Sequence, residues 1–348
     1  MIFFTHTGPI PLYLVAAILQ ARSVSHDEPI VLLTDQTENP IPLPIRHNIV
    51  IASISDYRER ADLFSAKFRF EGRNSFAYEL WNFQRWFVIE EYARLNKVEA
   101  PLLHLDSDAF LYVAPSTVFR TVTAPLTVCD TSGPQFVFLK NQHSLAEYTS
   151  FIDQHFSSDA GYQRLRDYVA DLQDPGVPHV SDMVTLGLFG EEHEVEDIGS
   201  PSRSDFQFCE NIGSSQGLRL GPTGKKIRKR KGIPHFIRHS GDLIPAGGVH
   251  LQGGNKDLWP LFASPGVRRQ ALRYFPQRYG LALRDMVRKV LLALGMQVSR
   301  RLRNALGKTR YVFTGSHYQR EFGQDYARNR NHEYYLALDH VFADGSKL

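Results

Sequence analysis

Two short apolar runs that each end in an acidic residue constrain the fold of this chain most. Residues 30–34 are Ile-Val-Leu-Leu-Thr and lead into Asp35, and residues 101–105 are Pro-Leu-Leu-His-Leu and lead into Asp106. Runs of this kind are typical of strands that are buried on both faces of a parallel sheet. Because residues with helical spacing separate the two runs, the sequence predicts an α/β fold, a mostly parallel sheet flanked by helices.

The remaining elements follow from the spacing of apolar residues and from capping residues. Asn74 and Ser75 are suited to cap a long helix in which Phe76, Leu80 and Phe83 recur at intervals of four and three. Other segments are predicted in the same way: strands at 2–5 and 135–139, helices at 12–23, 146–156 and 162–172, and a basic hairpin between 225 and 237.

The composition is that of an ordinary globular protein. The chain has 348 residues, of which 43% are hydrophobic and 12% aromatic, so a sizeable core is expected; a net charge of +3 does not suggest a general polyanion binder. Cys129 and Cys209 are too few for a disulfide framework and predict two buried thiols in a reducing compartment. With neither a signal-peptide pattern nor an apolar run of about 18 residues, we expect a cytoplasmic protein.

The second acidic run contains two carboxylates, in the sequence Asp106-Ser107-Asp108. In an α/β sheet the ligand binds beyond the carboxyl ends of the strands, which is where this segment falls. Residues i and i+2 of an extended chain point to the same side, so the two carboxylates can converge. Converging like charges favour a bridging divalent cation, for which oxygen ligands are suitable. The alternative is a solvated turn, since Asp and Ser are common turn residues.

Two segments resemble a known family. Residues 103–112, Leu-His-Leu-Asp-Ser-Asp-Ala-Phe-Leu-Tyr, resemble the Asp-x-Asp region of bacterial glycosyltransferases with the GT-A fold. Residues 249–259 are similar to the His-x-x-Gly-x-x-Lys motif near the end of the catalytic domain in the glycogenin-like and lipopolysaccharide galactosyltransferase-like families. The resemblance implies a GT-A, Rossmann-like catalytic domain over residues 1–263. Residues 264–348 would form a basic, mainly helical extension.

The resemblance also implies a metal site and a donor. Asp106, Asp108 and His250 would bind Mn²⁺ or Mg²⁺, and imidazole suits Mn²⁺ better. Lys256 would contact the diphosphate of a nucleotide-diphospho-sugar, most simply a UDP-sugar, and Gly253 would let the backbone approach a phosphate. The alternative for His250 is a turn histidine with a local hydrogen bond.

Further positions correspond to donor-binding segments of the same family. Asp182 would hydrogen-bond the sugar hydroxyls or act as a base in an inverting enzyme; alternatively, it caps a helix that starts at Met183. The other expected donor contacts are Thr5, His6, Asp35, Arg85, Asp106, Ser107, Ser132, Gly133 and Gln135. For the segment 130–136 the alternative is a plain turn.

The reaction implied is transfer of a hexosyl group to a hydroxyl of a glycan or lipid-linked acceptor in bacterial cell-surface polysaccharide synthesis, with retention of configuration favoured. One alternative is phosphoryl transfer by an Asp-x-Asp nucleophile, although such enzymes usually carry Thr or Val where this chain has Phe110. Another is a non-catalytic glycan-binding module with a GT-A-like fold.

Basic residues cluster in two places. Between 281 and 320 there are nine Lys or Arg and one acidic residue, and apolar residues at helical spacing suggest that 281–310 binds an anionic membrane, on the inner face of the plasma membrane. The alternative is a helix packed on the catalytic domain. Six of residues 225–231 are basic, but no aromatic residues are interleaved, so we expect a solvated hairpin or a lip that attracts an anionic acceptor, and no nucleic-acid binding.

Overall fold

The computed structural model describes residues 1–36, 49–72, 74–130, 133–172, 179–200, 205–212, 217–221, 224–225, 227–230, 232–276 and 280. They fall into two compact units. Unit 1 consists of Met1–Ile10, Val24–Ala109 and Val113–Ser200, and unit 2 of Pro11–Ser23, Phe110–Tyr112 and the rest of the chain from Pro201. The predicted membrane-binding segment 281–310 lies outside the described residues.

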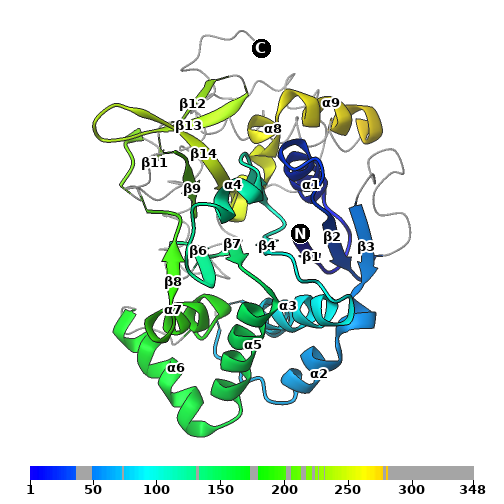
Figure 1. The fold of residues 1–348 in the computed structure, drawn as a ribbon, viewed down its shortest axis with the longest axis vertical. Coiled ribbons are helices and arrows are strands. Elements are labelled where there is room, and N and C mark those ends of the chain that lie inside the picture. The colour runs from blue at the N-terminus through cyan, green and yellow to red at the C-terminus, as the bar shows by residue number, and fades with distance from the viewer. Residues whose placement is uncertain are drawn as a thin grey trace, which may run out of the picture. The chain divides into compact units, whose positions relative to one another are not determined.

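Unit 1 contains a mixed sheet of seven strands in the order β3-β2-β1-β4-β7-β6-β8 (Figure 1). The strands are β1 (Ile2–His6), β2 (Ile30–Thr34), β3 (Ile49–Ser53), β4 (Leu102–Leu105), β6 (Leu126–Cys129), β7 (Gly133–Leu139) and β8 (Val195–Asp197). The first four in sequence are parallel, and β7 runs antiparallel to β4 and β6. Phe4 pairs with both Leu32 and Leu105, so the carboxyl ends of β1, β2 and β4 meet at one edge, as the sequence predicts.

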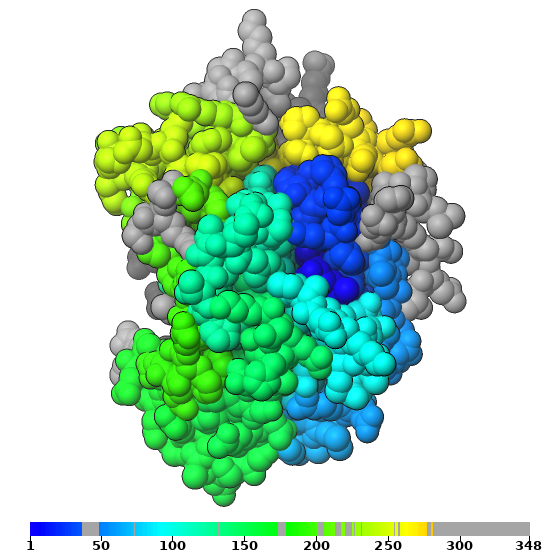
Figure 2. Space-filling model, in the orientation of Figure 1, coloured from blue at the N-terminus to red at the C-terminus, as the bar shows by residue number. Residues whose placement is uncertain are grey.

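The helices of unit 1 are α2 (Glu59–Ser65), α3 (Phe76–Leu95), α4 (Pro115–Phe119), α5 (Gln142–Phe156), α6 (Asp159–Leu172) and α7 (Asp182–Glu192), with a 3-10 turn at Ile54–Tyr57. Ser75 caps α3 by accepting a hydrogen bond from Tyr78 N, as predicted. Helix α3 packs against α2, α5 and α7, and Figure 2 shows α2, α5, α6 and α7 forming one continuous surface. The fold class is therefore the predicted one, a mostly parallel sheet flanked by helices.

Aromatic side chains of α2, α3 and α5 fill the core under these helices. Phe64 stacks on Phe87 with ring centroids 4.9 Å apart and meets Phe156 edge to face at 5.2 Å. Phe83, Trp86 and Phe87 are at most 1% exposed and belong to this core. The buried α3 thereby has a fixed position on the sheet, and its polar residues are fixed with it.

Unit 2 contains a second sheet in the order β12-β13-β14-β5, with β9 paired in parallel to β14. Its elements are α1 (Leu12–Val24), β5 (Ala109–Leu111), β9 (Gln207–Cys209), β10 (Leu220–Gly221), β11 (Gly224–Lys225), β12 (Ile227–Arg230), β13 (Ile233–Ile237), β14 (Leu243–His250), the 3-10 helix η3 (Gly253–Leu258), α8 (Trp259–Phe262) and α9 (Pro265–Tyr274). Strands β12 and β13 form the predicted basic hairpin, with Arg230 opposite Ile233.

Two further sequence-based expectations can be compared with the structure. Cys129 and Cys209 are both buried and form no disulfide, as predicted. Among the described residues, no helix is both long enough and apolar enough to span a membrane.

Candidate metal centre and its charged neighbours

The acidic pair lies in a tight turn between β4 and β5. The backbone N–H of Asp106 donates to the carbonyl of Gln135 (3.2 Å), and the N–H of Ala109 donates back to the carbonyl of Asp106 (3.0 Å). The side chain of Asp106 is 19% exposed, and Asp108 is only 4% exposed. The solvated-turn alternative is therefore wrong for Asp108. A carboxylate buried to this degree is stable only with partners that compensate its charge.

Arg85 of α3 joins two of the predicted acidic residues. Its Nη1 lies 2.6 Å from Asp106 Oδ1, and its Nη2 lies 2.6 Å from Asp182 Oδ2. Burial alone would lower the pKa of Arg85, but the carboxylates of Asp106 and Asp182 outweigh it and raise the pKa above the ordinary value. The guanidinium therefore stays charged and ties the first residue of the acidic pair to α7.

Asp182 is the first residue of α7, and its side chain does not cap the helix. The carboxylate accepts hydrogen bonds from Arg85 Nη2 (2.6 Å) and from Trp86 Nε1 (3.4 Å). The preceding Ser181 occupies the N-cap position without a side-chain capping bond. The helix-cap interpretation of Asp182 is therefore wrong. Burial raises the pKa of the Asp182 carboxyl, and Arg85 opposes that rise.

Sequence reasoning missed His104, a buried neighbour of this ion-pair network. Its Nδ1 lies 3.1 Å from the Pro134 carbonyl, and since a carbonyl only accepts, Nδ1 carries the proton. The ring centroid is 4.7 Å from that of Trp86. Burial, together with the nearby Arg85, lowers the pKa of His104 to about 3, so the imidazole is neutral. The signal in the sequence was a histidine within an otherwise apolar strand.

His250 ends β14 and is oriented by the neighbouring strand. Val249 pairs with Cys209, which puts Glu210 beside His250. The His250 Nδ1 lies 2.7 Å from the Glu210 carbonyl, so Nδ1 carries the proton and Nε2 carries the lone pair. Metal-binding histidines are usually held in this way, by a carbonyl or carboxylate on the ring nitrogen that does not face the metal. Its local hydrogen bond is thus compatible with a ligand role.

Asp106 and Asp108 of unit 1 and His250 of unit 2 could each bind a metal ion, since each offers one ligand atom, a carboxylate oxygen or a ring nitrogen. Two carboxylates and one imidazole form a donor set that suits Mn²⁺ and, less well, Mg²⁺. The residues present therefore fit the cation that the sequence suggests.

The predicted residues at the ends of β1 and β2 have local roles in the structure. Both carboxylate oxygens of Asp35 accept from the backbone N–H of Gly8, at 2.9 and 3.0 Å. His6 Nε2 lies 3.2 Å from the Pro9 carbonyl, and Thr5 is 7% exposed in β1. These three residues lie at the predicted edge of the sheet, and contact with a donor remains a prediction for them.

Gly133 and Gln135 lie at the start of β7. A Cβ at Gly133 would lie 2.0 Å from the Cys129 carbonyl oxygen, so only glycine fits there. Gln135 is 2% exposed, and its Nε2 donates to the same carbonyl at 3.4 Å. Its backbone carbonyl binds Asp106, which places Gln135 next to the acidic pair; Ser132 lies outside the described residues.

The downstream motif forms η3 in unit 2. Gly253 has a φ of +59°, a left-handed conformation that favours glycine. The ammonium of Lys256 lies 5.3 Å from the ring centroid of Tyr13 in α1. Ser107 lies in the turn between the two acidic residues, and its predicted donor contact stays a prediction.

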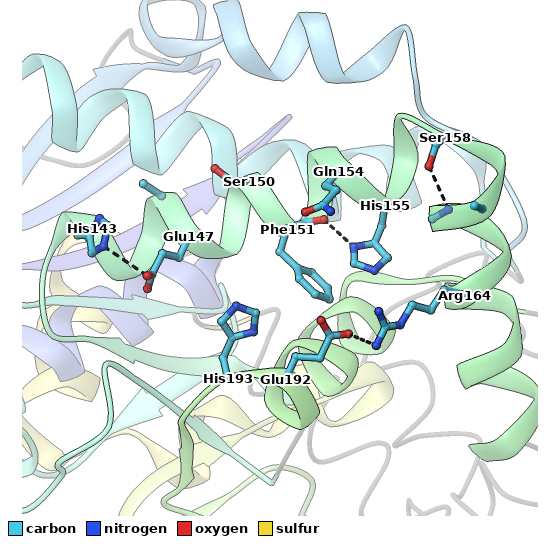
Figure 3. A pocket seen from close by; sticks show the side chains of 13 residues that line it. His143, Glu147, Ser150, Phe151, Gln154, His155, Ser158, Arg164, Glu192 and His193 are labelled. Carbon is cyan, nitrogen blue, oxygen red and sulfur yellow. Dashed lines mark hydrogen bonds and ion pairs between the residues drawn. The ribbon is translucent and has the colours of Figure 1, made fainter.

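A groove of about 780 Å³ lies elsewhere, among α5, α6 and α7 (Figure 3). Figure 3 shows the rings of Phe151 and His193 between two pairs of charged or polar side chains. One pair is His143 with Glu147 (3.3 Å), and the other is Arg164 with Glu192 (2.6 Å). None of the predicted site residues lines this groove.

Comparison with known proteins gives likenesses of structure only. No family model matches the chain, and no curated protein matches it in sequence. Among solved structures, the chain is similar to mouse xyloside xylosyltransferase 1, with a TM-score of 0.41 and 8% identity over 56% of this chain and 83% of that one. It is also similar to the galactosyltransferase LgtC, solved with donor and acceptor sugar analogs; the TM-score is 0.36 and the identity 12%, over 80% of this chain and 95% of that one. A third match is the glycosyltransferase GlyE of Streptococcus pneumoniae, with a TM-score of 0.32 and 15% identity over 56% of this chain and 44% of that one. Likenesses as distant as these do not assign a function by themselves.

Proposed function

We propose that this protein is a metal-dependent glycosyltransferase of the GT-A type. It would move a hexosyl group from a nucleotide-diphospho-sugar to a hydroxyl of a glycan or lipid-linked acceptor. The observation that carries the proposal is the acidic pair after β4, in which Asp106 is bound by the buried Arg85 and Asp108 is only 4% exposed. The hydrogen bond from His250 Nδ1 to Glu210 supports it, because it leaves the Nε2 lone pair as the ligand.

In this proposal Asp106, Asp108 and His250 hold Mn²⁺ or Mg²⁺. A bound divalent cation would neutralise the charge that develops on the departing diphosphate. Lys256 in η3 supplies a second positive charge for the diphosphate. Gly253, at the start of η3, has no side chain, so the backbone there can come close to a phosphate. A UDP-sugar is the donor that we propose.

Arg85 and Asp182 fit a role in holding the donor sugar. Asp182 Oδ2 accepts hydrogen bonds from Arg85 and Trp86, and its ion pair with Arg85 is buried. A carboxylate held in this way can still accept hydrogen bonds from sugar hydroxyls. We therefore propose that Asp182 orients the donor sugar and that the reaction retains the anomeric configuration.

The other donor contacts are proposed from their place in the fold. Thr5, His6 and Asp35 lie where β1 and β2 end, in register with the end of β4, and would contact the base and ribose. Gly133 and Gln135 lie beside the acidic turn and would contact the donor sugar. We place the enzyme in the cytoplasm, with residues 281–310 at the inner face of the membrane, where lipid-linked acceptors of cell-surface polysaccharides are made.

The test is a comparison of purified variants against a panel of sugar nucleotides. We expect wild-type protein to release nucleoside diphosphate from one donor in the presence of Mn²⁺. Asp108→Asn, which removes a ligand charge while keeping the side-chain shape, should lower that rate at least about 100-fold. Asp62→Asn is the matched control, because Asp62 is 53% exposed in a surface pair with Arg58 and should leave the rate unchanged.

The outcome that contradicts the proposal is equally plain. If folded Asp108→Asn turns over every sugar nucleotide at the wild-type rate with Mn²⁺ present, the acidic pair does not hold a catalytic metal.

A further inference from the structure

Lys225 is a fully buried lysine that the proposed reaction does not use. It lies in β11 with 0% exposure, although lysine is rarely buried completely, because removing an ammonium group from water costs several kcal/mol. Its Nζ donates to the Asn211 carbonyl (2.7 Å) and approaches Cys209 Sγ at 3.0 Å. A side chain held at this cost is expected to fix something that the protein needs.

Cys209 and Asn211, which both contact the Lys225 ammonium, flank one residue, Glu210. The carbonyl of Glu210 is the acceptor for His250 Nδ1, at 2.7 Å. Cys209 is the last residue of β9 and pairs with Val249, the residue before His250. The ammonium group therefore holds both neighbours of the carbonyl that orients the imidazole.

A second bond holds the same segment from the other side of His250. Asn211 Nδ2 donates to Gln252 Oε1 at 2.8 Å, which links the segment to the residues that follow β14. Gly247 permits the close approach of β9, because a Cβ there would lie 2.6 Å from the Phe208 ring. The residues around Glu210 are thus fixed by side chains as well as by strand pairing.

We infer that Lys225 is a positioning residue for His250, because its hydrogen bonds to Asn211 and Cys209 fix the Glu210 carbonyl and thereby set the tautomer of the His250 ring. The inference concerns the orientation of His250 and holds whether or not a metal binds; only its consequence for catalysis rests on the proposed function. When the Glu210 carbonyl is fixed, the proton stays on Nδ1 and the lone pair stays on Nε2.

The experiment records ¹⁵N spectra of the histidine rings in metal-free protein at about pH 8, where an ordinary imidazole is neutral. The His250 signals are identified by their loss in His250→Gln. Wild-type protein should show His250 as a single tautomer with the proton on Nδ1. In Lys225→Met, which removes the ammonium but keeps most of the side-chain volume, the ring should become a mixture of both tautomers.

Two comparisons make the test specific. Lys229→Met is the control, because Lys229 lies on the neighbouring β12 and is half-buried; it should leave the His250 spectrum unchanged. If Lys225→Met does not fold, Lys225→Gln carries the same prediction, because its amide is too short to reach both acceptors. A folded Lys225 variant in which His250 keeps the single Nδ1-protonated form would overturn the inference.

A Mn²⁺ titration separates this inference from the proposed function. If both hold, Lys225→Met weakens Mn²⁺ binding by roughly 10-fold or more, the usual effect of losing the support of a metal ligand. A shifted tautomer with unchanged Mn²⁺ affinity would support the positioning role and would remove His250 from the proposed metal site.

Discussion

At the scale of single residues, the arrangement of charge around Arg85 is the most informative feature. One guanidinium forms ion pairs with two carboxylates, Asp106 and Asp182, which are 76 residues apart in the sequence. The side chain of Asp182 is 4% exposed and that of Arg85 is 9% exposed, so water screens this pair little. Removal of the shared cation leaves two carboxylates close together with their charge uncompensated.

We therefore expect Arg85→Gln to destabilise the protein by about 3–5 kcal/mol, the range found when one partner of a buried ion pair is removed. Arg58→Gln is the matched control, because Arg58 pairs with Asp62 on the surface and both side chains are about half exposed; it should cost no more than about 0.5 kcal/mol. Urea unfolding monitored by circular dichroism measures the free energy of unfolding of both variants. Equal losses for the two variants would contradict a special role for Arg85.

His104 gives a prediction on pH. The folded-state pKa is lowered to about 3, while the unfolded chain has about 6.5, so between these values the unfolded state binds the extra proton. The contribution of the neutral His104 ring to the free energy of unfolding is fully present above about pH 6.5. It is lost as the pH falls toward 3, by about 1.4 kcal/mol per pH unit. His104→Asn should therefore lose stability less steeply than wild type between about pH 6 and 4. Parallel stability curves from urea unfolding would show that His104 does not titrate in this way.

At the scale of elements, the strands whose carboxyl ends meet at one edge of the sheet, β1, β2 and β4, were the most predictable part of the fold. β2 and β4 each consist of an apolar run that ends at an acidic residue, and the parallel pairing of β1 with both follows from this pattern. The start of α5 was predicted less well. It begins at Gln142 rather than 146, because Asn141 caps it by accepting from Ser144 N. A capping residue is easily overlooked when the apolar spacing starts one turn later.

The candidate site was predictable only where a local sequence pattern marks its residues. Asp106 and Asp108 are marked by their place after an apolar strand, and His250 by its motif. The pairing of Arg85 with Asp182 was not predicted, because it depends on how α3 and α7 pack on the sheet. The roles of His104 and Lys225 were missed for the same reason, since their partners lie in distant segments.

The turn between β6 and β7 gives a prediction at this scale. The N–H of Gly133 donates to the Asp130 carbonyl at 2.7 Å, and a Cβ at Gly133 would lie 2.0 Å from the Cys129 carbonyl oxygen. Gly133→Ala should therefore shift the start of β7 and destabilise the protein by about 1–3 kcal/mol. Gly266→Ala in α9 is the control, because its Cβ would meet nothing within 4 Å. A melting temperature lowered equally by both substitutions would contradict this account of the turn.

At the scale of the whole molecule, the uneven distribution of charge gives a prediction about location. The net charge is only +3, yet residues 281–320 carry nine basic residues and one acidic residue. If 281–310 binds an anionic surface, the full chain should sediment with vesicles of phosphatidylglycerol and not with phosphatidylcholine, and salt should release it. A variant in which Arg284, Arg288 and Lys289 are replaced by Gln should bind more weakly. Equal binding to both vesicle types would contradict the electrostatic interpretation.

The central claim is that Asp106, Asp108 and His250 hold one divalent cation, to which the diphosphate of the donor binds. Calorimetric titration of the full-length protein with UDP, in the presence of Mn²⁺ and in the presence of a chelator, tests it most directly. The account predicts heat of binding with Mn²⁺ only, lost in Asp108→Asn and kept in Asp62→Asn. UDP binding of equal affinity in the chelator, or in Asp108→Asn, would contradict the claim.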